Sequence, residues 1–177
     1  EYIVSMSSLS AGLAEYRDRS VSAQDPRRGE VYCNGDMNVS LIRTRLGRTV
    51  VLQHNTVTPR PYDRGLQISG TRGIFKDYPP RLYIEGEGPG EDWLPLEAYR
   101  AQWEDPLWTN LGELARKRGG HGGMDFLMNY RLLQVLQQGL PPDSDVYEAV
   151  EWSVPGPLSE LSVARGSAPV AFPNFRC

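Results

Sequence analysis

The sequence predicts an α+β fold, an open antiparallel or mixed β-sheet with helices covering one of its faces. Strand-like segments that alternate apolar and polar residues lie in the first half of the chain. Apolar residues at helical spacing dominate the second half. With 177 residues, 40% of them hydrophobic and 23% charged, the composition is ordinary for a globular protein. We therefore expect one two-layer domain over residues 1–177.

The first half is expected to supply the sheet. Residues 1–8 form a short β-like run, and residues 9–19 carry apolar side chains at helical spacing. The stretch 37–58 alternates on both sides of Gly47, which is typical of a hairpin. A second hairpin is expected in residues 65–86, where glycines again mark the turns. The two hairpins are expected to form one antiparallel sheet with a polar and an apolar face.

The second half is expected to supply the helices. Apolar residues in 123–138 are too dense for a strand of ordinary length, and Gly139 provides a stop. Similar patterns predict helices near 94–103, 107–118 and 144–151. Because the strands come first and the helices later, we expect the helices to cover one sheet face.

Composition and motifs exclude several classes of function. A net charge of −3 with interspersed signs argues against nucleic acid as a partner. No apolar run approaches the ~20 residues of a membrane span. Cys33 and Cys177 form neither a disulfide framework nor a metal-binding spacing, and they leave the cellular compartment undecided. Without an HExxH, P-loop, GxSxG or complete GxGxxG motif, no metal site or cofactor site is expected within the chain.

One candidate site residue is His121, in the stretch "RKRGGHGGMDFLMNY" at 116–130. Four glycines surround this histidine, and they allow positive φ and the close approach of another group. In one interpretation His121 contacts substrate in a cleft. In the other it is structural, with Asp125 holding the ring at the start of the following helix.

The other candidates lie in "QHNTVTPRPYDRG", residues 53–65, which two prolines stiffen. Tyr62 is suited to stack on a sugar ring while its hydroxyl forms a hydrogen bond. Arg64 is suited to donate to hydroxyl or carboxylate oxygens. The alternative is an inter-strand loop with solvated charges, and His54 on the preceding strand is interpreted as structural.

Four motifs, "YIVSMSS", "TVTPRPYDRG", "ISGTRGIF" and "GGHGGMDFLMNYRLL", together resemble the C-terminal domain of the Gfo/Idh/MocA oxidoreductase-like proteins. The closest resemblance is to glycoside hydrolase family 109, the bacterial NAD-dependent α-N-acetylgalactosaminidases, and it covers nearly the whole chain. It implies an upstream Rossmann domain that holds NAD, and an upstream Tyr-Pro-Thr-His segment. The catalytic residues are not identified in this chain and are expected upstream of it. The resemblance also implies that Tyr62 contacts the substrate, a glycan that contains N-acetylgalactosamine.

The resemblance further implies an oxidation, elimination and addition sequence. NAD takes a hydride from C3 of the sugar, the C2 proton becomes acidic, the aglycone leaves C1, and water and hydride then return. No pair of carboxylates on either side of the glycosidic bond is needed. Residues 1–177 alone are expected to be inactive, and the family leaves open an exported, periplasmic or cytoplasmic location.

Two alternatives remain at this point. One is an NAD(P)-dependent sugar or polyol dehydrogenase of the same superfamily, which would accumulate NADH during turnover. The other is an assembly domain that forms a homo-oligomer through the sheet face, with the polar face as the interface.

Overall fold

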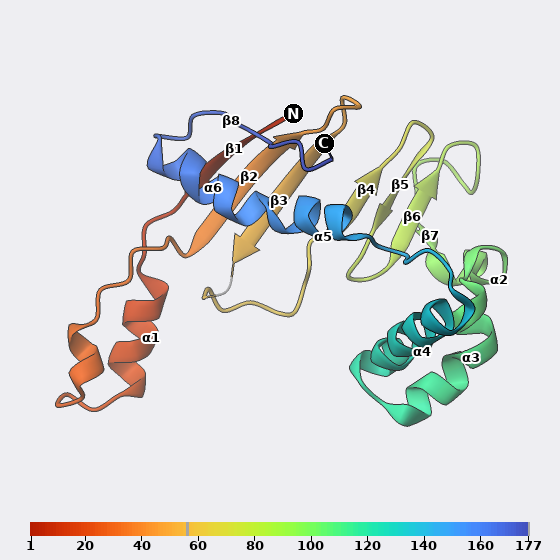
Figure 1. Cartoon of the computed structure of the whole chain (residues 1–177), viewed down its shortest axis with the longest axis horizontal. Coiled ribbons are helices and arrows are strands. Elements are labelled where there is room, and N and C mark those ends of the chain that lie inside the picture. The colour runs from red at the N-terminus through yellow and green to blue at the C-terminus, as the bar shows by residue number, and fades with distance from the viewer. Residues whose placement is uncertain (56, 177) are drawn as a thin grey trace. The chain divides into compact units, whose positions relative to one another are not determined.

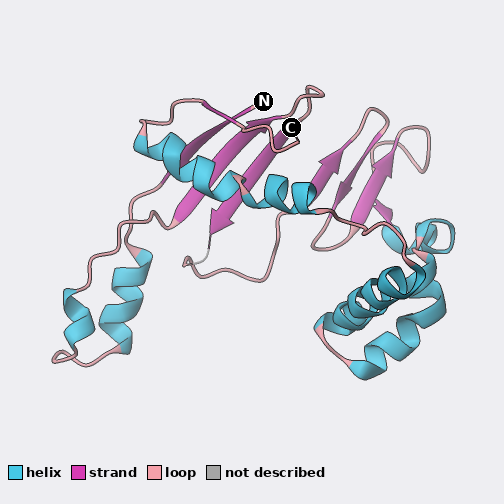
Figure 2. Ribbon diagram, viewed as in Figure 1, coloured by secondary structure: helices cyan, strands magenta, loops and turns pink. Residues whose placement is uncertain are grey.

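The computed structural model describes residues 1–55 and 57–176, so Cys177 lies outside the described residues. The chain divides into two compact units, residues 1–59 with 144–177 and residues 60–143. The predicted α+β class with open antiparallel sheets is confirmed (Figure 2). The prediction of one common sheet is wrong, because the described strands form two separate four-stranded sheets. Local alternation identifies strands, whereas their pairing depends on contacts distant in sequence.

The first unit contains the sheet of order β3-β2-β1-β8. Its strands are β1 (Tyr2–Ser7), β2 (Met37–Arg43), β3 (Thr49–Asn55) and β8 (Val170–Ala171). The hairpin expected in 37–58 is present as β2 and β3, and Gly47 adopts a φ of 78° in its turn. A positive φ is readily available to glycine, which explains this residue in the turn.

A helix that the sequence analysis missed covers this sheet. Figure 1 shows α6 (Pro155–Ala164) lying over the strands, and it packs against β1. The sequence Pro155-Gly156-Pro157 resembles a helix breaker, but proline is well tolerated in the first turn of a helix. Helix α6 follows α5 (Val146–Ser153), which was expected at 144–151 and begins with a capping box.

A small apolar cluster and a polar contact attach α6 to the sheet. Ile3, Leu158 and Val170 form the buried cluster. Beside it, Ser162 Oγ accepts a hydrogen bond from Ser5 N–H at 2.9 Å and donates to Ala168 O at 2.7 Å. All these polar groups have partners, so their burial carries no desolvation penalty for an unmade hydrogen bond.

The opposite face of this sheet is apolar and exposed within the described chain. Val4, Leu41 and Val51 are cross-strand partners on that face. Leu41 is 50% and Val51 60% exposed. The sequence places the assembly interface on a polar sheet face, whereas this exposed face is apolar, and assembly stays a prediction.

A helical excursion connects β1 and β2. It contains α1 (Gly12–Ser20) and the 3₁₀ turn η1 (Pro26–Gly29). The carboxylate of Asp36 accepts hydrogen bonds from the N–H groups of Ala11 and Gly12 at the start of α1. This contact satisfies amide groups that a helix leaves unpaired at its N-terminus.

The second unit begins with an antiparallel meander. Its strands are β4 (Gln67–Ser69), β5 (Gly73–Lys76), β6 (Arg81–Ile84) and β7 (Leu94–Pro95). The second hairpin expected in 65–86 therefore contains three strands instead of two. Residues 94–95, expected at the start of a helix, pair with β6 as a short strand.

Helices complete the second unit. They are η2 (Leu96–Tyr99), α2 (Arg100–Trp103), α3 (Pro106–Arg118), η3 (His121–Gly123) and α4 (Met124–Gln138). Helices α3 and α4 contact each other, and Gly123 allows the close approach, because a Cβ there would lie 2.8 Å from the carbonyl carbon of Ala115. Gly139 ends α4 with a φ of 62°, as the sequence predicts. No described helix is long and apolar enough to cross a membrane.

We expect Ser162→Ala to lower the stability of the first unit by about 1–3 kcal/mol, because it leaves the buried Ser5 N–H without its acceptor. Thermal or denaturant unfolding of the chain measures the change. Ser153→Ala is the matched control, since its hydroxyl bonds only to the helix carbonyl of Ala149 and is exposed. That variant should stay within about 0.5 kcal/mol of the parent. Equal effects of the two substitutions would contradict the role given to Ser162.

Candidate functional site

The structure brings together two of the predicted site residues, Tyr62 and Arg64, in the loop before β4. Arg64 Nε donates a hydrogen bond to Tyr62 Oη at 2.6 Å, and the guanidinium carbon lies 5.7 Å from the Tyr62 ring centroid. The Tyr62 ring meets the Tyr78 ring edge-on, with 5.5 Å between centroids and an interplanar angle of 86°. Tyr62 remains 69% exposed. The loop therefore presents an oriented aromatic ring and hydroxyl to solvent.

Local sequence explains how Arg64 reaches Tyr62. The carboxylate of Asp63 accepts a hydrogen bond from Gly65 N–H at 2.6 Å, and Gly65 adopts a φ of 60°. Such an aspartate-to-backbone contact two residues on is typical of a tight turn. Pro61 restricts φ directly before the tyrosine. The turn thus folds the arginine back onto the tyrosine.

The cluster shifts the acidity of both tyrosines. The hydrogen bond from Arg64 lowers the pKa of Tyr62, and hydrogen bonding with Tyr78 lowers it further. Burial raises the pKa of Tyr78, and the contact with Tyr62 adds to that rise. The Tyr62 hydroxyl is therefore a stronger acid than a free tyrosine, which favours donation of a hydrogen bond to a ligand oxygen.

Tyr78 belongs to the candidate site through its contact with Tyr62, and the sequence analysis missed it. It follows β5 in the Asp77-Tyr78-Pro79-Pro80 turn and adopts a φ of 64°. Its backbone N–H donates to the carboxylate of Asp77 at 2.6 Å. The only signal in the sequence is an aromatic residue in a proline-rich turn, which does not reveal its contact with Tyr62.

His121 lies at the N-terminal end of α4 with its side chain 74% exposed. Its Nδ1 lies 2.9 Å from Asp125 Oδ2 and 3.0 Å from Oδ1. Gly120 makes room for this pair, because a Cβ there would lie 2.7 Å from Asp125 Oδ2. Among the described residues, no hydrogen bond, ion pair or ring contact joins His121 to Tyr62 or Arg64. Its contact with substrate stays a prediction.

His54 and the acidic side chains do not form a metal-binding site in the described part of the chain. His54 lies on β3 in the first unit, where it is exposed and pairs across the strands with Asn38. In the part of the chain that the structure describes, no three His, Cys, Asp or Glu side chains gather as a metal site would require.

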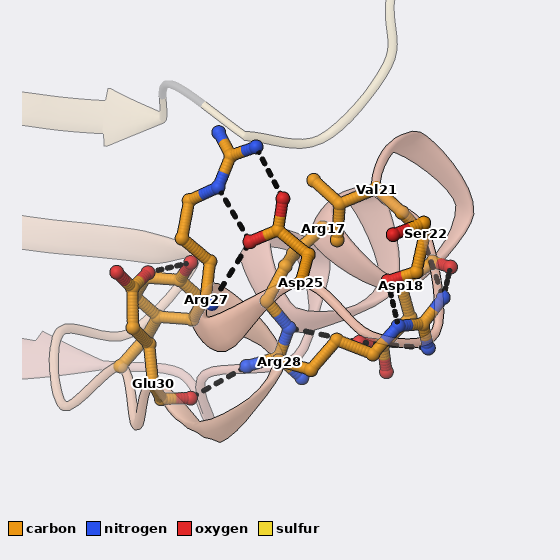
Figure 3. A network of polar contacts seen from close by, with 9 residues as sticks. Arg17, Asp18, Val21, Ser22, Asp25, Arg27, Arg28 and Glu30 are labelled. Carbon is orange, nitrogen blue, oxygen red and sulfur yellow. Dashed lines mark hydrogen bonds and ion pairs between the residues drawn. The ribbon is translucent and has the colours of Figure 1, made fainter.

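A network of polar contacts lies around α1 and η1 (Figure 3). Arg28 donates to the carbonyl oxygens of Asp18, Val21 and Ser22, where α1 ends. Arg27 binds Asp25 through its side chain and its backbone N–H, and these bonds lower the pKa of Asp25 to about 2. The charged groups satisfy one another and the local backbone, so the network stabilises the excursion.

The glycine-rich stretches do not fit a dinucleotide. A diphosphate binds at a helix N-terminus through free N–H groups and the positive end of the dipole. At α4 the carboxylate of Asp125 occupies this region, and the N–H groups of Gly123 and Asp125 bond to Gly120 O. The glycines in 86–90 precede the strand β7 instead of a helix.

Comparisons with known proteins agree with one another. The family model described as "Glycosyl hydrolase 109, C-terminal domain" matches residues 1–177. A glycosyl hydrolase family 109 protein of Solibacter usitatus is 58% identical over 173 residues, 98% of this chain and 39% of the relative. A protein of the same name from Saccharopolyspora erythraea is 47% identical over 98% of this chain and 37% of the relative. Another from Shewanella amazonensis is 44% identical over 99% of this chain and 39% of the relative. The chain thus spans about two fifths of the length of these curated relatives.

We expect Arg64→Gln to raise the pKa of Tyr62 toward its ordinary value, because the substitution removes the hydrogen bond that lowers it. Titration of ¹³Cζ-labelled tyrosine by NMR measures the change, with Tyr62→Phe assigning the resonance. Arg48→Gln, in the exposed turn between β2 and β3, is the control for loss of one positive charge. A Tyr62 pKa that is equal in parent and Arg64→Gln would contradict the contact.

Proposed function

This chain belongs to glycosyl hydrolase family 109, and we propose that it forms the substrate-binding part of a glycosidase that cleaves terminal α-linked N-acetylgalactosamine. The family resemblance seen in the sequence motifs is confirmed by the match over residues 1–177. That match, together with 58% identity to one relative, is the observation that carries the glycosidase part of the proposal, and the sugar follows from the family resemblance. The exposed Tyr62 and Arg64 pair supports it, since it offers an aromatic face and oriented polar groups.

In this proposal Tyr62 binds the sugar with its ring and its hydroxyl. The ring offers an apolar surface to the C–H groups of a pyranose, and the acidified hydroxyl donates a hydrogen bond to a sugar oxygen. Tyr78 holds the ring edge-on, and Arg64 fixes the hydroxyl while its other N–H groups remain donors. The cluster would orient the sugar before the reaction starts, which lowers the entropic part of the barrier.

His121 would add a second contact to the sugar. Asp125 engages Nδ1, which leaves Nε2 as the ring nitrogen available to a substrate hydroxyl. A carboxylate on one imidazole nitrogen fixes the ring orientation and the tautomer presented to a ligand. His121 is therefore proposed as a substrate-binding residue, while the residues that move protons in the reaction are proposed to lie upstream of this chain.

NAD is proposed as the cofactor of the complete protein, where it would accept a hydride from C3 of the sugar and later return it. Because the described glycine-rich segments do not fit a diphosphate, the upstream part of the protein would hold it. The share of this chain is to bind and align the sugar. Because the sugar is oxidised and the aglycone is then eliminated, cleavage needs no pair of carboxylates on the two sides of the glycosidic bond in the described chain.

An assay of the complete enzyme tests the proposal. With an aryl α-N-acetylgalactosaminide, we expect release of the aryl group without net accumulation of NADH, because the hydride returns to the sugar. Residues 1–177 alone should release none. Net NADH formation with retention of the glycosidic bond would instead indicate a dehydrogenase, and cleavage by the chain alone would contradict the need for an upstream part.

In the complete enzyme, Tyr62→Phe should lower kcat/KM roughly ten- to hundredfold, because it keeps the ring and removes the hydroxyl contact. The melting temperature should change little, since the side chain is largely exposed. Tyr16→Phe is the matched control, as an exposed tyrosine on α1. An unchanged kcat/KM in Tyr62→Phe would place this residue outside the site.

A further inference from the structure

Two cations face each other on the sheet of the second unit. Lys76 on β5 and Arg81 on β6 are direct cross-strand partners, so their side chains share one sheet face, and both residues are partly buried. Like charges placed directly opposite each other destabilise a sheet. Within residues 1–55 and 57–176, no carboxylate is ion-paired with either of them. The pair thus carries an unfavourable repulsion that an anion would relieve.

Trp93 orients the arginine of this pair. The guanidinium carbon of Arg81 lies 4.7 Å from the Trp93 ring centroid, and Arg81 Nε is buried without a hydrogen-bond partner among the described residues. Stacking on an indole fixes the plane of a guanidinium and leaves its N–H donors unused. An oriented arginine with unused donors is suited to the paired oxygens of a carboxylate or sulfate.

The same face continues into a hollow. Ile74 and Tyr83 are the next cross-strand partners on the side of Lys76 and Arg81. With the β4–β5 turn, which includes Arg72, and with Glu85 they line an open hollow of about 360 Å³. Lys76 and Arg81 do not line it but occupy the next positions along β5 and β6. A volume of this order suits a small molecule such as one or two sugar rings. The cationic pair and the hollow thus lie at successive positions of the same two strands, and the one carboxylate of the hollow, Glu85, lies at its end away from Lys76 and Arg81.

We propose that this face is a subsite for an acidic saccharide. Its carboxylate or sulfate group binds Lys76 and Arg81, and its ring lies against Trp93 and Tyr83. The inference rests on the proposed glycosidase function for its link to the substrate. Tyr78 supplies that link, because it lies in the turn that joins Lys76 to Arg81, and its ring contacts Tyr62. The acidic unit is then the part of the glycan next to the sugar bound at Tyr62.

Direct binding to the complete protein tests the subsite without any turnover. The probes are methyl β-D-glucuronide and methyl β-D-glucoside, which differ in one carboxylate, measured by calorimetry or ligand-observed NMR at fixed ionic strength. We expect roughly fivefold or stronger preference for the glucuronide, weakened by added salt. Lys76→Gln and Arg81→Gln should each remove most of this preference. Arg48→Gln, which removes an exposed positive charge in the first unit, should retain it.

Three results would overturn the proposal. The first is equal affinity for the glucuronide and the glucoside. The second is a preference for the glucuronide that persists in both Lys76→Gln and Arg81→Gln. The third is weaker NAD binding in these variants together with no binding of the glucuronide to the parent. The last result would assign the cations to the diphosphate of the cofactor. If Arg81→Gln fails to fold, Lys76→Gln and Arg81→Lys carry the test, since Arg81→Lys keeps the charge and loses the paired donors. Because no cleavage is measured, failure here is distinguishable from failure of the proposed glycosidase function.

Discussion

The contact between Ser5 and Ser162 is the constraint on which the chain's organisation depends. It joins residues 157 positions apart, and with Ile3 and Leu158 beside it, it attaches α6 to the first strand. The first unit is therefore built from both ends of the chain. In the sequence, residues 60–143 form an insertion between β3 and α5 of this unit. The loop of Tyr62 and the meander that follows it belong to this insertion.

Within the insertion, short-range contacts organise the candidate site. Arg64 binds a tyrosine two residues away, and Asp125 binds a histidine four residues away. Such contacts depend on turn and helix geometry more than on the surrounding fold, so the side chains are oriented before a ligand arrives. Binding then requires less ordering of the protein, which leaves more of the interaction energy for affinity. This arrangement is consistent with the proposed role, in which the domain positions a sugar for chemistry performed elsewhere in the protein.

Sequence reasoning predicted the features that local patterns determine. The class, the hairpin around Gly47 and helix α4 follow from alternation, helical spacing and glycine stops. Helix α6 was missed because its first turn contains Pro155 and Pro157, and the division into two sheets was missed because strand pairing is a long-range property. In the site, the proximity of Tyr62 and Arg64 was predictable from their spacing. The contact with Tyr78 depends on how a distant turn folds, which no local pattern encodes.

We propose that this domain binds a sugar that is cleaved by elimination at C1 and C2 and not by direct displacement. Hydrolysis of an α-N-acetylgalactosaminide by the complete enzyme in D₂O tests this claim most directly, with the released sugar analysed by NMR. Elimination requires loss of the C2 proton, so we expect deuterium at C2 of the product. A product that keeps its original hydrogen at C2 would contradict the account.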